Sequence, residues 1–165
     1  MKNSTGTLLI SKECAPKKNL LLTTFKVVHK EYLVTFELFF KTVGAKTYNL
    51  FHFTTGRDCC RVGTRVPSVW IHNKNMLHIC AAVNDVGSTE TNTVIPLNQW
   101  SKAEVRQRKD AGNQYIYSVT VNGKCVHRAV NRKPREFKNV RVYASDPYYP
   151  TEQGYIRNLF VQGYE

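Results

Sequence analysis

Apolar and polar residues alternate most regularly between residues 32 and 41 of the chain. A period of two is typical of a β-strand with one buried face, because successive side chains point to opposite sides of the sheet. The apolar positions are Tyr32, Val34, Phe36, Leu38 and Phe40, and the polar positions between and after them include Thr35, Glu37 and Lys41. We therefore expect a strand here whose apolar face lies in the core.

A second pattern predicts a hairpin centred on Asn122-Gly123. This dipeptide favours a type I′ turn, in which both central residues need positive φ. A two-residue loop fixes the register, so the expected opposite pairs are Val121 with Lys124, Thr120 with Cys125, Val119 with Val126 and Tyr117 with Arg128. The expected core face carries Tyr115, Tyr117, Val119, Val121, Val126 and Val130, and the more polar face carries Ile116, Ser118, Thr120, Cys125, His127 and Ala129.

The strand before this hairpin also alternates, but its outer face is charged. Ser101, Ala103, Val105 and Gln107 point one way, and Lys102, Glu104, Arg106 and Arg108 point the other. A row of four charges suits only solvent or an anionic partner.

Short strands of the same kind are predicted along the rest of the chain, separated by turn residues. They cover residues 7–11, 20–28, 48–54, 68–72, 76–83, 93–97, 138–144 and 155–162. Strands 68–72 and 76–83 are expected to pair, and the last strand is expected to pair with one near the N-terminus. Residues 84–92 are polar except for Val86 and are predicted to form a long loop, of the kind that binds something or moves.

These elements predict a single all-β domain over residues 1–165, with a core over roughly 20–163. The expected architecture is an antiparallel two-sheet β-sandwich of the jelly-roll kind, because no apolar stripe has the helical period. No apolar run approaches the length that spans a bilayer. The apolar stretch within the first eleven residues is also too short for a signal peptide. Either the protein stays inside the cell, or Met1 follows a signal that was removed.

Charge and cysteines add two constraints. The chain has 24 Lys and Arg against 12 Asp and Glu, a formal net charge of +12. Such a balance favours polyanionic partners, although a solvated soluble surface explains it as well. Five cysteines allow one or two disulfides and a leftover thiol. The adjacent Cys59 and Cys60 are not expected to bridge each other, so each needs a distant partner or stays reduced.

The order of these features resembles the laminin G-like and concanavalin A-like jelly-roll superfamily, which includes lectins and glucanases. The resemblance rests on Leu97-Asn98-Gln99-Trp100, on the strand that ends at Asn122-Gly123, and on the closing segment Gly154-Tyr155-Ile156-Arg157-Asn158-Leu159. It covers roughly residues 32–162. It implies an extracellular module that binds glycans, heparan sulfate or proteins, often with calcium at a loop rim.

If the resemblance holds, Asp85 and Asp146 are the acidic residues placed in loops where a calcium ion would bind. Calcium needs six or more oxygens, and isolated aspartates are commonly turn residues. Trp100 is expected either to stack on a sugar or to lie in the core as the first residue of a strand. The remaining predicted ligand-binding residues are Lys102, Arg106, Arg108, Arg128, Arg132, Tyr148 and Tyr149.

The sequence argues against an enzyme. Glycosidases on this scaffold carry a Glu-x-Asp-x-Glu strand, which is absent, and Glu104 lies between basic residues that would keep it ionised. Cys125 and His127 have no third residue to orient them as a nucleophile and base. A structural zinc site at Cys59, Cys60, His78 and Cys80 lacks the usual Cys-x-x-Cys spacing.

The sequence therefore predicts a secreted, non-enzymatic module that binds glycans, especially sulfated or acidic ones, or matrix and cell-surface components. No nucleic-acid motif accompanies the positive charge. The alternative is a structural or assembly protein of the matrix that self-associates through a cysteine cross-link.

Overall fold

The computed structural model describes residues 5–165, which form eleven strands and no helix. The strands are β1 (Thr7–Ile10), β2 (Leu21–Phe39), β3 (Tyr48–Thr54), β4 (Ser68–His72), β5 (Met76–Val83), β6 (Val86–Val94), β7 (Ser101–Lys109), β8 (Tyr115–Val121), β9 (Lys124–Asn131), β10 (Phe137–Tyr143) and β11 (Tyr155–Tyr164). In this part of the chain there is accordingly no helix long and apolar enough to cross a membrane.

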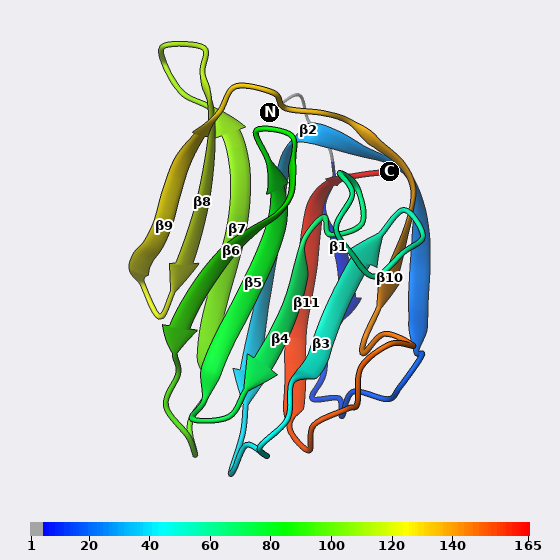
Figure 1. The fold of residues 1–165 in the computed structure, drawn as a ribbon, viewed down its shortest axis with the longest axis vertical. Coiled ribbons are helices and arrows are strands. Elements are labelled where there is room, and N and C mark those ends of the chain that lie inside the picture. The colour runs from blue at the N-terminus through cyan, green and yellow to red at the C-terminus, as the bar shows by residue number, and fades with distance from the viewer. Residues whose placement is uncertain (1–4) are drawn as a thin grey trace.

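Strand β2 belongs to two layers. Residues 21–28 pair with β10, and residues 32–38 pair with β7. The front layer has the order β6-β5-β4-β3-β10-β2, and the back layer has the order β9-β8-β7-β2-β11-β1, with antiparallel pairing throughout. Figure 1 shows β2 bending across the top of the molecule from one layer to the other. The prediction of two separate strands was wrong, because polar residues 29–31 carry the chain over the sandwich edge without interrupting β2.

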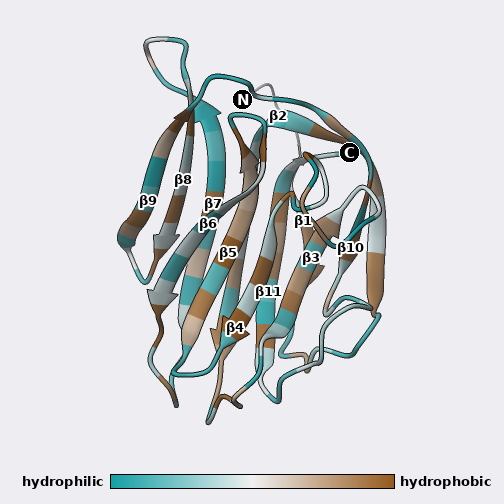
Figure 2. Cartoon of the chain, in the orientation of Figure 1, coloured by the Kyte–Doolittle hydropathy of each residue, from teal (hydrophilic) through white to brown (hydrophobic). Residues whose placement is uncertain are grey.

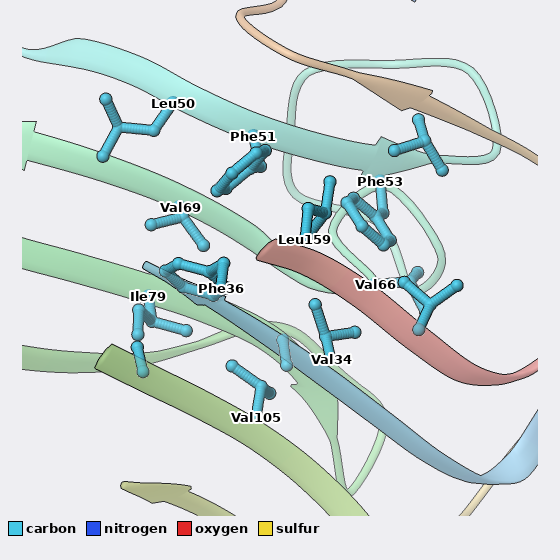
Figure 3. Packing of buried hydrophobic residues seen from close by; sticks show 14 of the residues in the cluster. Val34, Phe36, Leu50, Phe51, Phe53, Val66, Val69, Ile79, Val105 and Leu159 are labelled. Atoms are coloured by element: carbon cyan, nitrogen blue, oxygen red, sulfur yellow. The ribbon is translucent and has the colours of Figure 1, made fainter. Parts of the chain in front are cut away.

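The core lies between the layers and contains the apolar positions that the alternation predicts. Phe36 of β2 and Phe51 of β3 meet edge to face, with ring centroids 5.1 Å apart. Figure 3 shows these rings between the two layers, with Val105 of β7 and Leu159 of β11 on the back-layer side. Burying a side chain of this size contributes about 1.5–3 kcal/mol. The inward assignment of the Tyr32–Phe40 set and of Phe51 and Phe53 is confirmed.

The β8–β9 hairpin has the predicted turn but a different register. Asn122 and Gly123 have φ values of 49° and 79°, as a type I′ turn requires. Thr120 still lies opposite Cys125, but Val119 pairs with His127, so Val126 is an extra residue in β9. This is the pattern of a β-bulge, which exchanges the two faces of the bulged strand.

The bulge overturns the predicted pairs beyond it. Tyr117 lies opposite Ala129 rather than Arg128, and Ser118 lies opposite Arg128. His127 turns inward, with its ring 5.7 Å from that of Tyr117. Val130, which was expected in the core, lies opposite the outward Ile116.

The predicted loop over residues 84–92 is also wrong, because most of it is strand β6. Asn84 and Asp85 have φ values of 54° and 63° and form a tight turn between β5 and β6. Thr91 of β6 lies opposite the core residue Ile79 and is small enough to be buried at the edge of the sandwich. A threonine at an inward position adds too little hydrophobicity to produce an apolar alternation in the sequence.

Candidate functional site

A row of basic and hydroxyl side chains crosses the outer face of the back layer. Arg106 of β7 lies opposite Ser118 of β8, which lies opposite Arg128 of β9. Neighbouring strands are about 4.8 Å apart, so the two arginines stand about 10 Å apart at their Cα atoms with the serine between them. The row depends on the bulge at Val126, which directs Arg128 outward.

This row lines an open cavity of about 530 Å³ on the same face. The lining residues come from β7, from the β7–β8 turn, from β8 and from β9. They are Glu104, Arg106, Arg108, Lys109, Asp110, Ala111, Ile116, Ser118, Thr120 and Arg128. We call this set the basic pocket. The end of β7 that contributes to this lining is hydrophilic (Figure 2).

The two carboxylates of the basic pocket have partners of their own. Glu104 Oε1 lies 2.9 Å from Arg106 Nε, an ion pair on one strand. Asp110 Oδ1 accepts a hydrogen bond of 2.9 Å from the Gln114 backbone N–H and so closes the β7–β8 turn. Within residues 5–165, Arg108 and Arg128 have no carboxylate at ion-pair distance. The pocket therefore presents uncompensated guanidinium groups to solvent.

Lys102 and Trp100 lie toward the other end of β7, outside the basic pocket. Lys102 points outward opposite Glu37 of β2. Burial opposes ionisation of Glu37, but hydrogen bonds from Arg157 and Asn158 outweigh it and keep the pKa of Glu37 below its usual range. The guanidinium of Arg157 also lies 3.8 Å from the ring centre of Trp100, so it already covers one face of the indole.

Arg132, Tyr148 and Tyr149 do not join the basic pocket. Arg132 follows β9, and its backbone N–H donates to Asn84 Oδ1 at 2.6 Å. Tyr148 and Tyr149 belong to the loop after β10 and lie on the front layer, where the Tyr149 ring is 5.9 Å from that of Trp70. The eight predicted ligand-binding residues thus divide between two faces of the molecule.

The two predicted calcium-binding aspartates have separate surroundings. Asp85 is held by Arg135 and Lys133, at 2.7 and 3.1 Å, and hydrogen bonds from these cations lower its pKa. Asp146 is fully buried, and its Oδ2 lies 2.6 Å from His52 Nδ1. Among the described residues, one potential metal-ligating atom each of His52, Asp58 and Asp146 lies within 4.8 Å of the other two. Asp85 is not part of that cluster.

The buried His52–Asp146 pair fixes a loop on the front layer. His52 Nε2 donates to the Thr64 carbonyl at 2.7 Å, and Asp146 Oδ1 accepts from the backbone N–H groups of Tyr148 and Tyr149. All of these polar atoms are thereby satisfied inside the protein, as buried groups require. The pair is a structural link between β3 and the loop after β10.

The cysteines differ from the expectation in one respect. Cys59 and Cys60 are bonded to each other, whereas adjacent cysteines were expected to find distant partners or stay reduced. The three free cysteines are the half-buried Cys14, the buried Cys80 and the exposed Cys125.

Three solved structures of similar fold show which architecture this is. The chain superposes on a heptameric SAP-like pentraxin from Limulus polyphemus with a TM-score of 0.59 and 14% identity, covering 94% of this chain and 76% of that one. The fold is a jelly roll. No protein-family model matches the sequence, and no curated protein matches it.

Two further structures are sugar-binding domains by their descriptions. The CBM40 of a Ruminococcus gnavus sialidase, bound to α2,3 sialyllactose, has a TM-score of 0.54 and 11% identity, with 93% of this chain and 91% of that chain covered. Domain 4 of a GH43 arabinanase from Geobacillus stearothermophilus, in complex with arabinotriose, has a TM-score of 0.56 and 14% identity, with 99% and 84% covered. These similarities confirm the predicted jelly-roll sandwich, whereas the concanavalin A-like and laminin G-like assignments stay predictions.

Proposed function

We propose that this jelly roll is a non-enzymatic carbohydrate-binding module that takes anionic glycans in the basic pocket. The observation that carries the proposal is the row Arg106–Ser118–Arg128, because it places two guanidinium groups on either side of a hydroxyl. Guanidinium groups bind carboxylate and sulfate oxygens through short, charge-assisted hydrogen bonds, often two at a time. Arg108 and Lys109 extend the positive charge along the pocket.

The sugars named with the similar structures support a glycan as the ligand. Because these sugars differ in charge, the charge of the proposed ligand is argued from this chain's own residues. The CBM40 holds sialyllactose, an acidic sugar, and the arabinanase domain holds arabinotriose, a neutral one. A neutral sugar is commonly bound on an open aromatic face. The basic pocket contains no aromatic side chain, so its chemistry favours the acidic class.

The non-enzymatic part of the proposal rests on the arrangement of carboxylates in the basic pocket. Glycoside hydrolysis needs one carboxyl group that can donate a proton and a second that acts as nucleophile or base. Glu104 is paired with Arg106, and Asp110 is used in its own turn. Both carboxylates are thus already engaged by partners within the chain.

Calorimetric titration with a heparin-derived oligosaccharide tests the proposal, with sialyllactose as a carboxylate ligand and arabinotriose as the neutral comparison. We expect the anionic ligands to bind more tightly than arabinotriose. Arg128→Ala should weaken their binding about tenfold, since a hydrogen bond to a charged group contributes about 1.5–3 kcal/mol. The matched control is Arg61→Ala, which removes an exposed arginine from the loop between β3 and β4.

Equal losses in Arg128→Ala and Arg61→Ala would show that net charge alone attracts the ligand, and would contradict a site in the basic pocket. Equal affinity for arabinotriose would contradict the preference for anions. Because such glycans are displayed on cell surfaces and in matrices, we extend the proposal to a secreted protein with partners there.

A self-associating matrix protein is the second candidate, and exposed Cys125 on β9 is the feature that favours it. An exposed thiol can form a disulfide with a second copy of the chain in an oxidising compartment. Non-reducing electrophoresis of the oxidised protein should then give a dimer band that Cys125→Ser removes. A single monomeric band would leave this candidate without support.

A further inference from the structure

A cluster of metal-ligating side chains lies on the other face of the molecule, on the outer side of β5 and β6. His78 and Cys80 are two residues apart on β5 and so share a face, and Glu90 of β6 lies directly opposite Cys80. One donor atom from each of the three lies within 4.8 Å of the other two. The His78 Nε2 atom is 3.0 Å from Cys80 Sγ and 4.0 Å from Glu90 Oε1.

The imidazole of His78 is oriented as a metal ligand by a neighbouring amide. Its Nδ1 lies 2.6 Å from Asn92 Oδ1, which can only accept, so Nδ1 carries the hydrogen. The lone pair of the neutral ring is then on Nε2, which points toward Cys80 and Glu90. Metal-binding histidines are usually held in this way by an oxygen on the ring's other nitrogen.

The thiol of Cys80 holds a proton at the place where a metal ion would bind. With the lone pair on Nε2, the short contact between Nε2 and Sγ is an S–H donor facing a nitrogen acceptor. A divalent ion that bonds to both atoms replaces this proton, which leaves to solvent.

The distances fit a tetrahedral ion after small side-chain movements. Zinc bonds of about 2.3 Å to sulfur and 2.0 Å to nitrogen put those two atoms about 3.5 Å apart, so the Cys80–His78 contact opens by about half an ångström. The same geometry draws the Glu90 carboxylate closer to Nε2 by a similar amount. The Glu90 side chain is 55% exposed and free to make this movement.

The charges around the cluster also suit a divalent cation. A Cys80 thiolate and the Glu90 carboxylate supply two negative charges, which match a dication. The nearby Arg65, 3.8 Å from Cys80 Sγ, is balanced by Asp58 at 3.7 Å. The buried Trp70 ring packs against His78 at 5.6 Å and gives the site an apolar wall.

We propose that His78, Cys80 and Glu90 bind one zinc ion, with a fourth position open to water. The donor set of one thiolate, one imidazole and one carboxylate, with Asn92 behind the imidazole, is the observation that carries this site. Three protein ligands with an open position are typical of zinc that binds or activates a further small ligand. The site lies on the front layer and is independent of the glycan proposal.

Cobalt(II) titration tests the site, because a cobalt–thiolate bond gives a near-ultraviolet charge-transfer band and tetrahedral cobalt gives intense visible bands. We expect one cobalt per chain, displaced by zinc, in a Cys125→Ser background that removes the exposed thiol. Cys80→Ser should abolish the charge-transfer band. Glu90→Gln, at an exposed position that folding does not require, should weaken cobalt binding on the order of tenfold or more.

Cys14→Ser and Glu104→Gln are the matched controls and should leave the cobalt spectrum and affinity unchanged. The proposal is overturned if no thiolate band appears, if the band survives Cys80→Ser, or if Glu90→Gln and Glu104→Gln bind cobalt equally.

Discussion

The outer faces of the two layers are built from the same strand alternation but differ in what covers them. On the back layer, Arg106, Ser118 and Arg128 form a row that lines an open pocket, which the β7–β8 turn borders. On the front layer, Trp70 is only 2% exposed, because Arg65 and Tyr149 pack against it from two loops. The comparison shows that the strands place side chains on a face, whereas the loops decide whether that face stays open to solvent or is covered.

The largest expected effect is a loss of stability when a buried contact of the covered front layer is removed. His52→Ala removes the partner of a fully buried carboxylate, and an unpaired buried charge costs roughly 3–5 kcal/mol. The free energy of unfolding, measured in urea, should fall by that amount. His72→Ala, on the same face but hydrogen-bonded to the hydroxyl of Thr47 rather than to a buried carboxylate, is the matched control and should cost much less. Equal losses would mean that the buried pair does not hold the covered face together.

A smaller effect is expected on the open face of the back layer, where a substitution should change ligand affinity rather than stability. Ser118→Asp places a carboxylate between the two arginines, where the proposed ligand's anion would bind. Affinity for the heparin oligosaccharide should fall by about tenfold or more, because like charges repel and the arginines gain an internal partner. Stability should change by no more than about 0.5 kcal/mol at this outer position. Ser118→Thr keeps the hydroxyl and should bind normally, and a Ser118→Asp protein that binds as well as the parent would place the ligand elsewhere.

The smallest effect concerns the edge where β2 passes between the layers. The hydrogen bond to Glu136 raises the pKa of His29 against the opposing effect of burial, and Glu165 adds to the increase. Because the folded pKa is raised, this stabilisation is complete below the unfolded value of about 6.5 and is lost as pH rises through the folded value. Its size is below about 1 kcal/mol, because the groups are exposed. The melting temperature of His29→Gln relative to the parent should therefore be lower at pH 5.5 than at pH 8.5, and a constant difference would contradict the linkage.

The sequence predicted the fold well where periodicity and turn residues agree. The alternation from Tyr32 to Phe40 and the Asn122-Gly123 turn both identify elements that the structure contains. It missed β6, because Thr91 and its neighbours fill inward positions at a sheet edge without hydrophobic side chains. A turn at Asn84-Asp85 was the signal available for it.

The candidate sites depend on features that a sequence pattern does not show. Arg106, Arg108 and Arg128 were predicted as one outward set and do line one pocket, but the bulge at Val126 that aligns Arg128 has no marker in composition. Tyr148 and Tyr149 were grouped with them, although the loop after β10 turns to the front layer. Loop direction is set by buried contacts such as His52–Asp146, which join residues far apart in sequence.

The most direct test of the central claim is an NMR titration of the isotope-labelled protein with the heparin-derived oligosaccharide. We expect the largest amide shifts at residues 104–111, 116–120 and 128, with residues 52, 70 and 78 unchanged. Saturable shifts confined to the front layer, or small shifts spread over every lysine and arginine, would contradict binding in the basic pocket.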